Sequence, residues 1–175
     1  RNPEDAWIAN GYKPDFQAAA TAGRDGTISF YSQDRGSYLG QLLNHEWGHL
    51  LMWASKPEEA SFERGANLEK EDLAKKKAYY ISEYSKKDLD ENWAEHTSGL
   101  LNPNPEVFLT VAHKAPIRST IIGTALLKAQ GNAPEQHVGI NRAELEVRLN
   151  YLKTAILPKA QTDMAFHLTS VKGEQ

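Results

Sequence analysis

The chain has 175 residues, with 20 Lys and Arg against 23 Asp and Glu, and a formal net charge of −3. Hydrophobic residues make up 40% of it, which is too many for a disordered chain and enough for one globular domain over residues 1–175. The near-neutral charge predicts no nucleic-acid partner, and no apolar run reaches the roughly 20 residues of a membrane span. The absence of Cys excludes disulfides, thiolate metal ligands and thiol catalysis.

The first 26 residues are rich in turn-forming pairs, which predict loops around a short helix or strand. After the Asp25-Gly26 turn, β-branched and aromatic side chains predict a strand over residues 26–32. Apolar residues at helical spacing then predict a helix from an N-cap at Ser37 to an end near Ser55-Lys56-Pro57. Because this helix is apolar on nearly every face, we expect it to be central and buried.

The rest of the chain is predicted to be helical. A charged helix is expected over residues 68–85, with its charges facing solvent. Residues 159–175 are expected to form a loose tail. Further helices are expected from a cap at Asp88 or Asp90 to Leu101, from Asn104-Pro105 onward, from Pro116 to Gln130, and from Asn141 to Leu157 with Pro158 as the stop. The predicted class is therefore α+β and mostly helical.

The expected buried helix contains His45-Glu46-Trp47-Gly48-His49. Two His at positions i and i+4 lie on one helix face, so both imidazoles can bind one metal ion. Glu46 is rotated by about 100° and lies beside that ion, where it can take a proton from water and return it to a leaving amine. Burying these polar side chains on an apolar helix is unfavourable without a metal or other polar partners, which favours a metal site.

A third metal ligand is expected on the next helix, where Glu91 and Glu95 stand at i and i+4. Glu91 suits the third protein ligand of a site that keeps an open position for water. Glu95, one turn later, suits a carboxylate that accepts the free ring N–H of a ligating His. His96 is a less favoured ligand, because it points elsewhere than Glu91.

Tyr84 stands seven residues before Glu91 and could donate a hydrogen bond to an oxyanion, with Tyr79 and Tyr80 as competing tyrosines. The pattern His45-Glu-x-x-His49, Tyr84 and Glu91-x-x-Ala-Glu95 resembles the gluzincin metallopeptidases of the anthrax lethal factor-like group, which includes the secreted Pro-Pro endopeptidases. The resemblance covers residues 26–130. It implies a zincin-like domain with a small sheet over the motif helix and a helical C-terminal part.

Carried onto this chain, the resemblance implies Zn²⁺ on His45, His49 and Glu91. It also implies that Glu46 is the general base and Tyr84 the transition-state donor. An extended peptide would align by β-augmentation along the strand formed by Thr27, Ile28, Ser29, Phe30 and Tyr31.

The expected function is therefore that of a zinc-dependent endopeptidase acting as a monomer on a peptide or protein substrate. No signal peptide is visible, and the location expected from the resemblance is outside the cell or inside a target cell, as a toxin or effector domain. The alternative is a zincin-fold module that binds a partner without proteolysis. The chain departs from the family at Asn92-Trp93, where Phe-Phe is usual, at His96, and over residues 131–175. The helix expected at 141–157 is read as packed on the core, with an interaction or autoinhibitory element as the other possibility.

Overall fold

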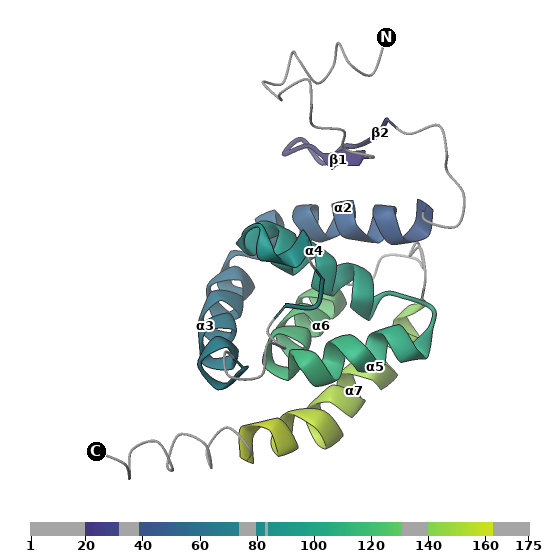
Figure 1. Ribbon diagram of the computed structural model, residues 1–175. Coiled ribbons are helices and arrows are strands. Elements are labelled where there is room, and N and C mark those ends of the chain that lie inside the picture. Colours follow the sequence, from purple (N-terminus) through teal and green to yellow (C-terminus); the bar gives the residue numbers. More distant parts are fainter. Residues whose placement is uncertain (1–19, 32–38, 74–79, 83, 131–139, 163–175) are drawn as a thin grey trace.

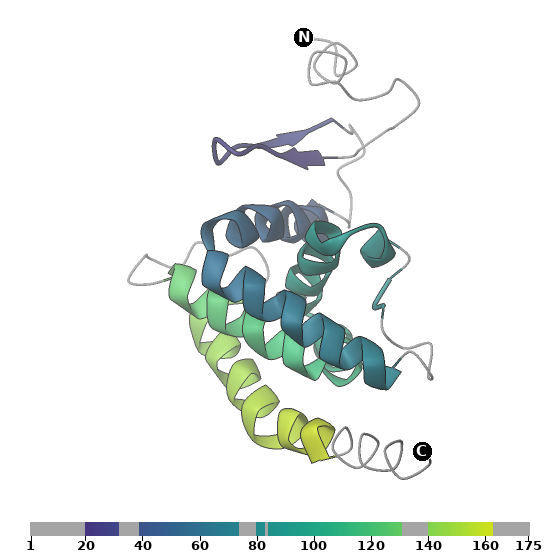
Figure 2. The same ribbon diagram turned by 90° about the vertical axis from the view of Figure 1, so that its left-hand side faces the viewer.

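A computed structural model describes residues 20–31, 39–73, 80–82, 84–130 and 140–162. It has the predicted α+β class, with one small two-stranded antiparallel sheet and a predominance of helix. Figures 1 and 2 show the β-hairpin lying over helix α2 (Leu39–Ala54), on the side away from the other helices. Within the described ranges, no helix combines the length and apolar character that crossing a membrane requires.

The hairpin joins β1 (Ala20–Ala22) to β2 (Ile28–Phe30) through the predicted Asp-Gly turn. Gly26 has a φ of 85°, a conformation that L side chains rarely adopt. The Asp25 carboxylate accepts hydrogen bonds from the Thr27 N–H at 3.1 Å and the Thr27 hydroxyl at 2.7 Å. The strand predicted at 26–32 is thus confirmed at its centre, and β1 is its partner.

Helix α3 (Lys56–Leu73) starts 12 residues before the charged helix predicted at 68–85. Helix α2 ends at Ala54, beside the predicted end at Ser55-Lys56-Pro57, and Pro57 lies in the first turn of α3, where a missing N–H leaves no hydrogen bond unmade. Residues 80–82 are not helical, so the predicted helix is also too long at its C-terminal end. Residues 84 and 85 of that prediction lie in a 3₁₀ turn, whereas 74–79 and 83 lie outside the described part, as does the expected cap at Ser37.

One charge of α3 faces the core instead of solvent. The Glu69 side chain is buried, and its carboxylate accepts hydrogen bonds from the Ile117 N–H at 2.6 Å and from Arg118 Nε at 2.5 Å. Arg118 is fully buried, and its Nη1 donates to Asn92 Oδ1 at 2.9 Å. This network joins α3 and α6 (Pro116–Gln130) to α4 (Leu89–Leu100) at the residue next to Glu91.

Helix α4, rather than α2, is the most deeply buried helix of the described part. Of the two predicted caps, Asp88 is the one used, and its carboxylate accepts the Glu91 N–H at 2.8 Å. From Glu91 to Leu100, every residue of α4 except Glu95 is buried. Its close partners are α2, α6 and the 3₁₀ turn η2 (Tyr84–Lys86).

The C-terminal helices complete the core. Helices α5 (Pro105–Lys114) and α6 begin where predicted. Helix α7 (Arg142–Tyr151) and the turn that follows it bury four apolar side chains in the same core, Leu145, Leu149, Leu152 and Ile156. Arg148 ties α7 to the end of α4, because its Nη1 donates to the Leu100 carbonyl at 2.8 Å. The prediction that the helix expected at 141–157 packs on the core is therefore confirmed.

The prediction that Pro158 ends this helix is wrong. The chain makes a π-helical turn, η3 (Leu152–Ile156), and continues as a helix to residue 162. In that turn the Leu157 N–H bonds to the Leu152 carbonyl, five residues back. The wider turn displaces the carbonyls that a proline ring would meet in a regular helix, which explains why Pro158 is tolerated. The loose tail predicted at 159–175 is thus wrong for 159–162, and 163–175 lies outside the described residues.

Candidate metal centre

The site forms where α2 crosses α4 beneath the hairpin. Helix α2 presents His45 and His49 one turn apart, and Glu91 faces them from the first turn of α4. The helices come this close because Gly48 lies at their contact: a Cβ atom there would be 2.8 Å from Ala94 Cα. Gly48, the small residue between the two His, therefore sets the distance between the His pair and the Glu91 carboxylate.

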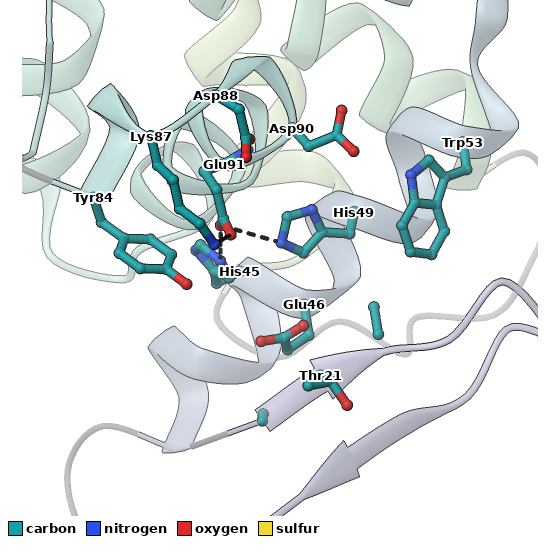
Figure 3. A pocket seen from close by; sticks show the side chains of 12 residues that line it. Thr21, His45, Glu46, His49, Trp53, Tyr84, Lys87, Asp88, Asp90 and Glu91 are labelled. Carbon is teal, nitrogen blue, oxygen red and sulfur yellow. Dashed lines mark hydrogen bonds and ion pairs between the residues drawn. The ribbon is translucent and has the colours of Figure 1, made fainter. Parts of the chain in front are cut away.

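The three side chains bring their ligand atoms together (Figure 3). Glu91 Oε2 lies 3.1 Å from His45 Nε2 and 3.4 Å from His49 Nε2, and all three ligand atoms lie within 4.8 Å of one another. Donor atoms about 2.0–2.1 Å from a zinc ion at tetrahedral angles lie about 3.3 Å apart. The group formed by His45, His49 and Glu91, largely buried, could therefore hold a metal ion.

Glu95 lies behind His45, on the side away from the metal position. Its Oε1 accepts a hydrogen bond from His45 Nδ1 at 2.8 Å, so His45 Nε2 is directed toward Glu91. Burial disfavours the charged form of His45, but hydrogen bonds to Glu91 and Glu95 outweigh it and raise the pKa of His45 to about 9. In the metal-free protein, His45 is thus an imidazolium held between two carboxylates.

Glu91 is correspondingly easy to ionise. Burial alone would raise its pKa, but hydrogen bonds from His45, His49 and Lys87 hold the pKa of Glu91 far below its usual range. Burial also opposes ionisation of Glu95, yet the hydrogen bonds from His45 and Ser82 lower the pKa of Glu95 overall. Both carboxylates are therefore anionic near neutral pH.

Glu46 lies between the His pair and β1 and is not one of the three ligands. It faces a cavity of about 200 Å³ that the ligand residues also line. Burial raises the pKa of the Glu46 carboxyl, although the two His and a hydrogen bond from the Ala22 backbone act in the opposite direction. A buried carboxylate with a raised pKa, beside three residues that could hold a metal ion, has the properties of a general base.

Tyr84, on η2, lines the same cavity as Glu46. Its ring centroid is 5.6 Å from that of His45, and its hydroxyl points toward the cavity (Figure 3). Burial and the nearby Glu91 charge raise the pKa of Tyr84, so the phenol stays protonated as a donor. Of the competing tyrosines, Tyr80 does not line this cavity and Tyr79 lies outside the described residues.

His96 is not part of the group. It is fully buried on another face of α4, where its Nδ1 donates to the Asn92 carbonyl at 2.7 Å and its ring packs edge-on against Phe62. Burial moves the pKa of His96 well below its usual value, so it is a neutral core residue. The sequence spacing distinguishes His96 from Glu91, because residues five positions apart on a helix lie on different faces.

The cavity is lined by β1 rather than β2. Ala20, Thr21 and Ala22 face it, whereas none of the five residues Thr27–Tyr31 does. Gly23 N–H bonds to the Thr27 carbonyl, so by antiparallel alternation Thr21 and Ser29 form the next bonded pair. The backbone groups of Ala20 and Ala22 therefore point away from β2, as the Ala22 bond to Glu46 requires.

Two further side chains line the cavity and were not singled out from the sequence. Trp53, four residues after His49, stacks on its ring at 6.0 Å between centroids, and the Arg24 guanidinium of the hairpin turn lies 5.2 Å from the Trp53 ring centroid. Lys87, four residues before Glu91, donates to Glu91 Oε1 at 3.0 Å. The i,i+4 spacing to a predicted ligand is the signal that could have found both.

A methyl group on Gly48 is expected to disturb the site more than it disturbs the fold. It would lie 2.8 Å from Ala94 Cα and 3.0 Å from Thr97 Cβ. Gly48→Ala should therefore destabilise the protein by about 1–3 kcal/mol and weaken binding of a divalent metal about tenfold. Unfolding curves and metal titrations measure the two effects.

The matched control is Gly123→Ala on α6, which makes the same change in another helix. Its Cβ would meet only the end of the flexible Leu149 side chain at 3.0 Å. This variant should bind metal as the wild type does. Unchanged metal affinity in Gly48→Ala would contradict the assigned role of the helix crossing.

Comparisons with family models, with curated proteins and with solved structures each found no match to this chain.

Proposed function

We propose that this chain is a zinc-dependent endopeptidase with a zincin-like domain, similar to the anthrax lethal factor-like gluzincins. The observation that supports it is the convergence of the ligand atoms of His45, His49 and Glu91, with Glu91 Oε2 3.1 Å and 3.4 Å from the two His Nε2 atoms, on a cavity that Glu46 also lines. Two imidazole nitrogens and one carboxylate oxygen, with no thiolate, form the donor set of catalytic zinc sites that keep a fourth position open.

Zinc held by these residues would acidify a water molecule and polarise the scissile carbonyl. Glu46 would take the proton from the attacking water and pass it to the leaving amine. The Tyr84 hydroxyl, on the lining of the same cavity, would donate to the carbonyl oxygen as negative charge develops on it. Glu95 would keep His45 in the tautomer whose Nε2 faces the site.

An extended substrate would align along β1 instead of β2. β1 borders the cavity, and the backbone groups of Ala20 and Ala22 point away from β2. A peptide strand placed there would lie between the hairpin and the ligand helix α2, next to Glu46.

The test is a digest of a proteome-derived peptide library by the protein before and after metal removal. We expect cleavage by the zinc-loaded protein, none after treatment with a chelator, and recovery when about one equivalent of zinc is returned. Stoichiometric zinc without any cleavage would instead favour the non-proteolytic binding module. Cleavage that persists without metal would contradict both.

A further inference from the structure

Lys87 is the only Lys or Arg among the residues that line the cavity in the described part of the chain. It precedes the cap Asp88, in the turn that follows η2, and its side chain is 48% exposed. Its backbone N–H bonds to the Tyr84 carbonyl at 3.1 Å, which closes that turn. From there its side chain reaches into the site, as Figure 3 shows.

The two oxygens of Glu91 have different partners. Oε1 accepts from Lys87 Nζ at 3.0 Å, whereas Oε2 lies 3.1 Å and 3.4 Å from the Nε2 atoms of His45 and His49. A charge-assisted hydrogen bond of this kind is about twice as strong as a neutral one. The Glu91 side chain is 10% exposed, so water competes little for its oxygens.

A zinc-binding carboxylate can use one oxygen or both. If both bind, one more coordination position is taken by protein, and less of the ion is left for water and substrate. An ammonium group held on Oε1 prevents this, because an oxygen that faces a cation and its N–H groups is a poor ligand for a second cation.

We propose that Lys87 is a positioning residue that reserves Oε1 of Glu91, so that Glu91 can bind a metal through Oε2 alone. The inference rests on the metal site of the proposed function but not on proteolysis. Its alternative is an ion pair that only stabilises a buried carboxylate, in which case removing Lys87 changes stability and leaves the metal's coordination as it was.

The two roles separate in the visible spectrum of the protein loaded with one equivalent of Co²⁺, because d–d bands are intense for four-coordinate and weak for five- or six-coordinate cobalt. We expect wild type to give the four-coordinate spectrum. Lys87→Met, which keeps the length of the side chain and removes its charge, should lose several-fold in band intensity as Glu91 becomes bidentate. Lys87→Arg should restore the intense spectrum.

Lys86→Met is the matched control: Lys86 is the neighbouring lysine, exposed like Lys87, but it does not line the cavity, and its variant should give the wild-type spectrum. Lys87→Gln, which keeps an N–H donor of smaller size, is the second test variant and should give intermediate intensity. An unchanged four-coordinate spectrum in Lys87→Met at full cobalt occupancy, or a five-coordinate spectrum in wild type, overturns the proposal.

The same titration separates this inference from the function. If wild type takes up no Co²⁺, both the proposed metal site and the proposed role of Lys87 are contradicted. If wild type binds Co²⁺ in the four-coordinate form but the zinc-loaded protein cuts no peptide, only the peptidase proposal fails. The comparison of Lys87→Met with Lys87→Arg then still decides what Lys87 does.

Discussion

Replacing Glu46 with glutamine is expected to lower peptide cleavage by about a thousandfold while zinc stays bound. The amide has the size and shape of the carboxylate but cannot accept the proton of the attacking water. Glu46 is not among the three ligands, so the change removes no donor to the metal. Its position beside β1 is kept as well, because a glutamine oxygen can accept the Ala22 N–H as the carboxylate does.

The measurement is kcat/KM on a peptide identified in the library digest, together with zinc content for each variant. Glu63→Gln makes the same chemical change on the exposed face of α3 and should leave both values at wild-type level. A Glu46→Gln protein that loses its zinc would mean that Glu46 is a ligand. One that cleaves at the wild-type rate would mean that another group accepts the proton.

The parts of the site that could be predicted from the sequence are those fixed by helical geometry. The i,i+4 spacing of His45 and His49, and again of Glu91 and Glu95, predicts which side chains share a face. The structure places the first pair around one carboxylate of the second, with Glu95 behind His45. Local capping chemistry likewise places the start of α4 at Asp88.

Features that depend on distant partners could not be predicted in this way. Glu69 reads as one of many charges on a solvated helix, and only the burial of Arg118, 49 residues later, gives it a partner. β1 is an Ala-Thr-Ala segment with little strand propensity, and it is held by pairing with β2. Pro158 is a strong stop by local rules, which the π-helical turn before it overrides.

Stability and zinc affinity are expected to respond to pH in opposite directions between pH 6.5 and 9. His45 has a raised pKa of about 9 in the metal-free protein against an unperturbed value of 6.5. Its proton therefore stabilises the metal-free fold fully below pH 6.5, and this contribution, on the order of 3 kcal/mol, is lost as the pH rises through 9. Unfolding of the chelator-treated protein by urea at several pH values measures the loss.

Zinc must displace the same proton from His45 Nε2, so its apparent affinity should rise about tenfold per pH unit up to about pH 9, with release of about one proton from His45. Competition with a chelator gives the affinity, and calorimetry in two buffers gives the proton count. Glu95→Gln keeps an acceptor for His45 Nδ1 but removes a negative charge that raises the pKa of His45, so its zinc affinity should level off at a lower pH than in wild type. A wild-type zinc affinity that does not change between pH 7 and pH 8.5 would contradict the imidazolium held between Glu91 and Glu95.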